Sequence, residues 1–394
     1  MTPSLSIVAF AADRPMSPRG ERALSVAEAA ARIAAVELIS PTRGAALRRR
    51  ARPLARVASP VMLDCWEPEA RWALGLRRSV PDAALLVGFP FSPVYWAARW
   101  LVPRKVKYVV DLGDPWALTL PPDELPPMGR LRAARCEWFV WRFASAGVVT
   151  TAPQADALRR LFPALPITVR PNGFRPVPVP AAPTTWWPSS RTLRLAHYGN
   201  LYGSRLPIAP LLAGLAASGH WEHVVFTQYG EDWTDTLKGV SPAVRVELRP
   251  PLPWEKVVAS ASEHDVAVVV GNRNPAQLPS KSVQYLTLPI ARLAVVGGQP
   301  SDALTEYVRD KPGWITLPWD APVDVAARAI ASHTARAWTR RQLAPPAGES
   351  WADVAAALVD VVRVHALGEW SQRSGGQLPT PMPAIAAATN SQPR

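Results

Sequence analysis

The sequence predicts an α/β protein with two domains, each built on a doubly wound parallel sheet. Apolar runs of strand length alternate with helix-like stretches along most of the chain, a pattern that indicates parallel strands joined by helices. A proline-rich segment divides this series into two parts. The length of 394 residues exceeds what one ordinary core supports. Two domains of roughly 150–200 residues are therefore expected.

The first domain is expected at residues 1–176. Two helix-like segments lie in it, 20–33, which is rich in Ala and Glu, and 153–162. The expected strands are 5–10, 34–40, 84–89, 106–112, 146–151 and 167–171. This alternation predicts a Rossmann-like domain.

A linker is expected at residues 177–191, because residues 176–190 hold five prolines and show no helical or strand period. The second domain, at 192–345, is also expected to be Rossmann-like. Its expected strands are 193–199, 223–230, 244–250, 264–271, 291–298 and 313–318. Val and Leu at helical spacing then predict a C-terminal helix within 346–370, followed by a disordered tail at 371–394.

Composition and charge narrow the class of protein. A hydrophobic content of 48% with 19% charged residues is typical of a soluble globular chain. There is no apolar run of about 18 residues and no basic start typical of a signal peptide. Cys65 and Cys136 lie far from each other and from any His cluster, so neither a disulfide framework nor a metal site is predicted. A cytoplasmic location is expected.

The positive charge is concentrated in the first half of the chain. Residues 1–180 hold 25 Lys and Arg against 14 Asp and Glu, and six arginines without an acid lie within 42–56. Such a segment is typical of a solvated basic face, a nucleic-acid surface or a platform for anionic lipid head groups. No helix-turn-helix, zinc-finger or RNP-type motif accompanies it, which makes nucleic acid the weakest interpretation. The other two stay open, and the lipid platform predicts reversible peripheral contact with the inner face of the cell membrane.

The candidate site residues directly follow predicted strands, where open α/β sheets bind their ligands. They are Asp111 and Asp114 in "VVDLGDPW", Asn172 in "RPNGF", Gly199, Asn200 and Arg205 in "HYGNLYGSR", and Ser280 and Lys281 in "LPSK". Each also has a structural explanation. Asp114 is suited to cap a helix, Asn172 and Gly199 to make turns, and Lys281 to lie on the surface.

Taken together, the glycine loop and the helix entrance at "LPSK" predict an anion site in the second domain. Glycines let the backbone approach a pyrophosphate, and Arg205 and Lys281 would neutralise it from two sides. Asp111 and Asp114 do not have the spacing of a metal-binding DxD motif. No metal and no cofactor are expected.

From residue 5 to residue 368 the chain resembles family 4-type glycosyltransferases of the two-Rossmann-domain (GT-B) architecture. "VVDLGDPW" is similar to the family's "DxRDPW" segment, and "GVVTTAPQADALRRLFP…ITVRPNGF" to the stretch that closes the first domain. "HYGNLYGSRLP" is similar to the "GxLxxxKG" pyrophosphate loop, with Arg205 at the lysine position. "LPSKSVQYLTLPIARLAV" resembles "iPsK..EYla.g.Pvla", and "ESWADVAAAL" the "fsW" start of the terminal helix.

The resemblance implies a glycosyltransferase of the hexosyltransferase type. Its N-terminal domain would bind the acceptor, its C-terminal domain the nucleotide-sugar, and the C-terminal helix would return to the first domain. Arg205 and Lys281 would stabilise the leaving diphosphate, and Asp114 would orient the acceptor or donor sugar. Asp111, Asn172, Gly199, Asn200, Ser280 and Gln284 would contact substrate.

Four departures from the family pattern affect the site. Gln284 stands where a glutamate usually grips the ribose, and a neutral amide forfeits about 1 kcal/mol of charge-assisted hydrogen bonding. Ala276 replaces a second glutamate, and Gly113 replaces the arginine before Asp-Pro-Trp. The glycine-rich first loop is reduced to "PRGER" at 18–22.

The predicted function is transfer of a sugar from a nucleotide-diphosphate-sugar donor to a polysaccharide, glycolipid or small-molecule acceptor, and the resemblance implies that the transfer retains the anomeric configuration. Two alternatives stay open. A sugar-nucleotide epimerase of the same fold would need acid/base carboxylates or His residues between the domains. A non-catalytic homologue would bind nucleotide-sugar and act as a partner subunit.

Overall fold

The computed structural model describes residues 2–9, 18–40, 79–88, 90–120, 127–176, 185–186, 191–201, 205–233, 236–299, 302–334, 338–339 and 343–368. The arginine-rich segment at 42–56 and the predicted tail lie outside these residues, as does most of the predicted linker. Within the described residues no helix is long and apolar enough to cross a bilayer.

The first domain contains a six-stranded parallel sheet in the order β2-β1-β3-β4-β5-β6. The strands are β1 (Ser4–Ala9), β2 (Ala35–Ile39), β3 (Ala83–Gly88), β4 (Lys107–Leu112), β5 (Ala146–Val149) and β6 (Ile167–Val169). Every residue of β3 is buried, because helices cover both faces of a parallel sheet.

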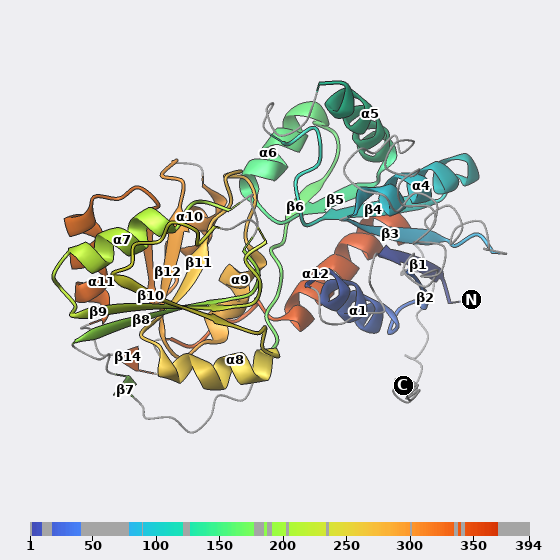
Figure 1. Cartoon of the computed structure of the whole chain (residues 1–394). Helices are drawn as coiled ribbons and strands as arrows, with labels where there is room; N and C mark the ends of the chain where they lie inside the picture. Colours follow the sequence, from blue (N-terminus) through green and yellow to red (C-terminus); the bar gives the residue numbers. More distant parts are fainter. Residues whose placement is uncertain are drawn as a thin grey trace, which may run out of the picture.

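Helices lie on both sides of this sheet (Figure 1). They are α1 (Pro18–Ala30), α4 (Phe91–Leu101), α5 (Pro127–Phe143) and α6 (Ala152–Leu161), with a short 3₁₀ turn, η2 (Val102–Arg104), after α4. The expected loop at 18–22 is instead the first turn of α1. One core packs α4 and α5 against the sheet, and a second packs α1 together with the C-terminal helix.

The second domain contains a six-stranded parallel sheet in the order β10-β9-β8-β11-β12-β13. The strands are β8 (Thr192–Tyr198), β9 (His223–Tyr229), β10 (Val244–Arg249), β11 (Val266–Val270), β12 (Ala291–Val296) and β13 (Trp314–Pro318). The helices are α7 (Ala209–Ala217), α8 (Trp254–Ser260), α9 (Ser280–Gln284), α10 (Ala303–Val308) and α11 (Val323–Thr334), with 3₁₀ turns η4 (Ala261–Glu263) and η5 (Tyr285–Thr287).

The chain returns to the first domain through α12 (Trp351–Val362), which continues as a π-helical turn, η6 (Arg363–Leu367). Ser350 and Asp353 form a capping box at its start, which satisfies two backbone donors. Trp351, Val354 and Leu358 belong to the same core as α1, and α12 lies alongside α1 (Figure 1).

The predicted fold class is therefore confirmed: two Rossmann-like sheets and a C-terminal helix packed on the first domain. All twelve expected strands are present, and none of their ends is shifted by more than two residues. One difference lies in the predicted linker, where β7 (Thr185–Trp186) pairs with β14 (Trp338–Thr339) in a small antiparallel sheet. These two strands were not predicted. A strand of two residues is too short to show an alternation of apolar and polar residues, and its partner strand lies far away in the sequence.

Candidate functional site

The candidate site lies where the carboxyl ends of β4 and β5 in the first domain face the loop that follows β11 in the second. Two contacts join the domains there. Thr151 donates a hydrogen bond to the carbonyl oxygen of Ala276 (2.7 Å), and the Gln277 side chain donates one to Asp114 Oδ1 (2.6 Å). Residues that follow the strands of both sheets thus meet at one place, as expected for ligand sites of open α/β sheets.

Gly199 and Lys281 lie in direct contact. Gly199 directly follows β8 with a φ of +125°, and a Cβ added there would overlap Cε and Nζ of Lys281. The Tyr285 hydroxyl accepts a hydrogen bond from the Tyr198 backbone N–H (2.7 Å), which fixes α9 and its following turn against the end of β8. The absence of a side chain at Gly199 therefore lets the lysine ammonium lie directly over the backbone.

Lys281 is half-buried, and its ammonium makes no hydrogen bond or ion pair with another described residue. Burial, followed by the nearby charge of Arg205, lowers the pKa of Lys281 to about 8. An ammonium in this setting gains from any anion that approaches it, because the anion offsets both effects.

Arg205 lies close enough to both Lys281 and Asp114 to influence their ionisation. Its Nη1 donates to Asn272 Oδ1 (2.7 Å) and to the Val270 carbonyl (3.2 Å), which anchors the guanidinium to the end of β11. Its charge lowers the pKa of both Lys281 and Asp114. Two cations and a carboxylate therefore lie within electrostatic reach of one another.

Asp114 keeps a partly exposed side chain, at 21%. Burial opposes its ionisation, but the Arg19 charge, hydrogen bonds from Arg19 and Gln277, and the Arg205 charge together hold its pKa below the usual value. Arg19, from the first turn of α1, forms the ion pair. Arg19 thus pairs with Asp114 from a segment distant in the sequence. The residue directly before Asp114 in "LGDPW" is Gly113, where the family that the sequence resembles has an arginine.

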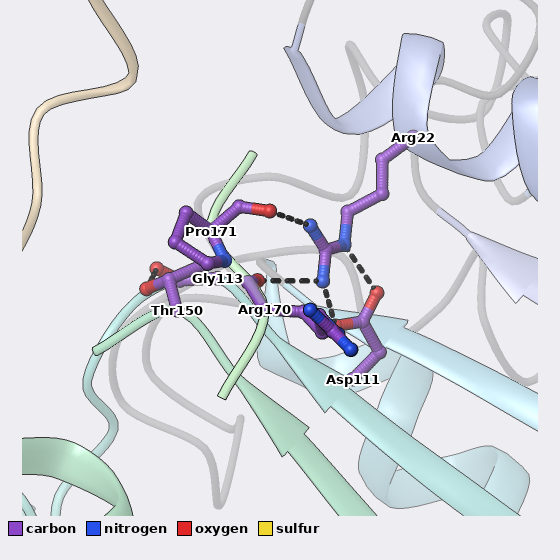
Figure 2. A network of polar contacts seen from close by, with 6 residues as sticks. All are labelled: Arg22, Asp111, Gly113, Thr150, Arg170 and Pro171. Atoms are coloured by element: carbon purple, nitrogen blue, oxygen red, sulfur yellow. Dashed lines mark hydrogen bonds and ion pairs between the residues drawn. The ribbon is translucent and has the colours of Figure 1, made fainter. Parts of the chain in front are cut away.

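Asp111 lies deeper, in a different environment. Arg22 donates to both of its carboxylate oxygens, at 2.6 and 2.8 Å, and also to the carbonyls of Arg170 (3.1 Å) and Pro171 (2.9 Å) (Figure 2). The Asp111 side chain is fully buried. The ion pair thus ties α1 to β4 and to the segment after β6. The substrate contact predicted for Asp111 would require a different conformation.

The remaining predicted residues occupy less direct positions. Asn172 is half-buried, and the adjacent Gly173 packs closely on the start of α12, where an added Cβ would lie 2.6 Å from the Trp351 nitrogen. Asn200 accepts a hydrogen bond from the Glu231 backbone (3.0 Å), which fixes the loop after β9. Ser280 and Gln284 are half-buried at the first and last positions of α9.

His197 was not predicted as a site residue. Its Nδ1 lies 2.9 Å from the Val268 carbonyl and must therefore carry the proton, while the buried Nε2 makes no hydrogen bond of normal geometry to a described residue. Burial, and then the charges of Lys281 and Arg205, lower the pKa of His197 to about 3 against weaker opposing backbone hydrogen bonds. The ring is neutral, and its Nε2 is available to accept a hydrogen bond near Lys281. A histidine closing an apolar strand, in "LRLAHYG", is the signal that sequence reasoning passed over.

Two other features lie outside this site. A cavity of about 650 Å³ lies on the face of β8, β9 and β10, lined by residues that include Arg245, Glu247, Arg249 and His264, and it contains none of the predicted site residues. Among the described residues no group of three or more His, Cys, Asp or Glu side chains could hold a metal ion.

Comparison with known proteins identifies the fold. No family model matches the chain, and no curated protein sequence matches it. Among solved structures it is similar to MnaA from S. aureus in complex with UDP (TM-score 0.55, 8% identity, 93% of this chain and 97% of that one). It is also similar to HepE from Anabaena in complex with UDP-glucose (TM-score 0.55, 13% identity, 94% and 98%).

A third similar structure is the N-terminal domain of trehalose-6-phosphate phosphatase from Candida albicans (TM-score 0.59, 11% identity, 93% and 97%). These identities are low, so the likeness establishes the architecture alone. The chain has a GT-B-type fold. Membership of family 4, as expected from the sequence motifs, stays a prediction.

Proposed function

We propose that this GT-B-type chain is a glycosyltransferase that takes a sugar from a nucleotide-diphosphate-sugar and transfers it, with retention, to a polysaccharide, glycolipid or small-molecule acceptor. The observation that carries this proposal is the position of Lys281 over Gly199 with Arg205 nearby. Two cations at the carboxyl ends of β8 and β11 are suited to hold a diphosphate.

The chemistry follows from the charge that develops during transfer. Breaking the bond between the sugar and the diphosphate leaves additional negative charge on the departing phosphate oxygen. Arg205 and Lys281 would stabilise that charge, and they do so most strongly in the transition state. Asp114, on the first domain and near Arg205, would accept a hydrogen bond from a sugar hydroxyl and orient it.

The nucleoside would lie against α9 and the adjacent loops. Gln284, at the last position of α9 and one turn after Lys281, would hydrogen-bond the ribose. Ser280 would contribute at the diphosphate. The solved structures of MnaA with UDP and of HepE with UDP-glucose support uridine diphosphate as the first nucleotide to test, because both share this architecture.

Calorimetric titration of uridine, UMP and UDP against the parent protein tests the proposal. Affinity should rise from uridine to UDP. Arg205→Ala and Lys281→Ala should each weaken UDP binding about tenfold or more, since a charge-assisted hydrogen bond contributes roughly 1.5–3 kcal/mol. Uridine should bind all proteins alike. Arg309→Ala, at an exposed site in the second domain, controls for the loss of one positive charge. An equal affinity for uridine and UDP would remove the main support for the proposal.

Incubation with a panel of nucleotide-sugars separates the three functions. A glycosyltransferase hydrolyses its donor slowly in the absence of acceptor. An epimerase of the same fold returns an isomeric nucleotide-sugar instead. A non-catalytic homologue binds its ligand unchanged. The cytoplasmic location and the acceptor remain predictions.

A further inference from the structure

Helix α5 of the first domain presents large apolar side chains to solvent. Met128, Leu131, Trp138 and Phe143 are all exposed, Trp138 at 50% and Leu131 at 47%. They account for four of the eleven large hydrophobic side chains exposed among the described residues. The opposite side of α5 packs into the core through Ala133, Val140 and Trp141. The helix is therefore held by one face, and the other face remains apolar but uncovered.

Exposed arginines lie among these apolar side chains. Arg132, Arg135 and Arg142 follow the spacing of a helix face together with Leu131 and Trp138. The lone acidic residue of α5, Glu137, is buried, where it accepts hydrogen bonds from the Leu118 backbone and the Trp141 ring. The exposed face of α5, defined by Met128, Leu131, Arg132, Arg135, Trp138, Arg142 and Phe143, is thus apolar and positively charged along its length.

The neighbouring helix α4 extends this face with aromatic and basic groups. Tyr95 and Phe139 meet edge to face with ring centroids 6.1 Å apart, and Phe139 lies 5.0 Å from Phe143. The guanidinium carbons of Arg99 and Arg142 lie 5.7 Å from the ring centroids of Phe139 and Phe143 respectively. These are cation–π contacts, and they hold the two positive charges beside the aromatic rings.

We propose that the exposed face of α5 docks on an anionic lipid bilayer. Trp and Phe rings favour the boundary between head groups and acyl chains, and arginines beside them reach the lipid phosphates. Here three arginines alternate with the apolar groups, without an exposed acid on the helix. The proposal does not depend on sugar transfer, and it rests on residues other than the arginines at 42–56.

Sedimentation of the full chain with vesicles tests this proposal. One set contains phosphatidylcholine and phosphatidylglycerol in equal amounts, and the other phosphatidylcholine alone. The parent should bind the anionic vesicles better, and less so at high salt. Each basic residue near such a surface contributes about a factor of five. The triple variant Arg132→Gln/Arg135→Gln/Arg142→Gln should therefore bind about 100-fold more weakly.

Matched variants in the second domain test whether vesicle binding depends on where a charge or ring is lost, or only on the loss itself. Arg194→Gln/Lys256→Gln/Arg309→Gln also removes three positive charges, from exposed sites of the second domain, and should bind vesicles nearly as well as the parent. Trp138→Ser should lower binding about tenfold, as expected for loss of a large apolar group from the interface. Trp233→Ser, which removes a ring exposed at 57%, should leave binding unchanged. Circular dichroism verifies that all four variants are folded.

Equal vesicle binding by the α5 variants and their second-domain controls would overturn the proposal. So would failure of the parent to bind anionic vesicles. If light scattering instead showed a parent dimer that Trp138→Ser converts to a monomer, with no vesicle binding, the face would be an interface between copies of the chain. That result too would overturn lipid docking.

Discussion

Gln277 of the second domain donates a hydrogen bond to Asp114 of the first, with 2.6 Å between Nε2 and Oδ1. The other carboxylate oxygen of Asp114 pairs with Arg19. The carboxylate is therefore held by both domains at once. A substrate hydroxyl that approaches Asp114 would have to share Oδ1 with Gln277 or Oδ2 with Arg19, or replace one of these donors.

Asp114→Asn should leave UDP affinity within about twofold, because Asp114 belongs to the first domain and the proposed diphosphate site to the second. Turnover should fall strongly, because an amide loses the charge that strengthens the hydrogen bond to a sugar hydroxyl. Donor hydrolysis and calorimetry measure the two effects. Gln277→Ala, which removes the link but keeps the carboxylate, is the matched variant. If both variants lose turnover equally, Asp114 serves only to join the domains.

The strands were predictable because a strand that is buried on both faces of the sheet needs apolar residues at every position, which gives a continuous apolar run in the sequence. All six residues of β3 are buried, and "AALLVG" contains no polar residue. Helix α12 was predictable because Val and Leu recur in it at helical spacing, and the structure shows in addition that Ser350 and Asp353 cap its start. The two-residue strands β7 and β14 were not, because their pairing depends on a contact between distant segments.

Gly199→Ala should weaken UDP binding about tenfold. The added Cβ would displace Lys281, and a positive φ of +125° already disfavours a side chain there. Gly219→Ala is the matched control, because Gly219 also has a positive φ but no atom within 4 Å of an added Cβ. Calorimetry and thermal unfolding should show that Gly219→Ala shares the backbone strain without the loss of affinity. Equal UDP affinity in the two variants would contradict the assigned role of Gly199.

The site was predictable only where a local motif carries it. "GNLYGSR" and "LPSK" pointed to Gly199, Arg205 and Lys281, which the structure brings together. The partners of the two aspartates could not be read in this way, because Arg19 and Arg22 lie some 90 residues away from them in the sequence. For the same reason, Asp111 could be placed near the site but not recognised as half of a buried ion pair.

Asp111→Asn should lower the free energy of unfolding by about 3–5 kcal/mol, because it leaves the buried Arg22 guanidinium without its counterion. The network in Figure 2 shows that no other carboxylate there replaces it among the residues drawn. Chemical denaturation measures the loss. Asp156→Asn is the control, since Asp156 is exposed and its pair with Arg159 is worth at most about 1 kcal/mol. Similar losses in the two variants would show that the Arg22 pair contributes little.

Lys281 predicts a pH dependence of diphosphate binding. Its pKa of about 8 in the unliganded protein, set by burial and then by Arg205, should rise when an anion binds. Below pH 8 the ammonium is charged in both states and does not change the affinity. As pH rises above 8, the free protein loses the proton that the complex keeps. UDP affinity should then fall, by up to about tenfold per pH unit.

Calorimetry between about pH 7 and 9, in two buffers of different ionisation enthalpy, measures both the fall and the proton taken up. Lys281→Arg is the matched variant, because a guanidinium stays charged over this range. The ionisation of UDP itself is common to both proteins, so the difference between them reports Lys281. The parent should lose affinity with rising pH while the variant does not. Identical pH profiles would mean that Lys281 does not face the bound diphosphate, and the charge that holds it would have to come from Arg205 alone.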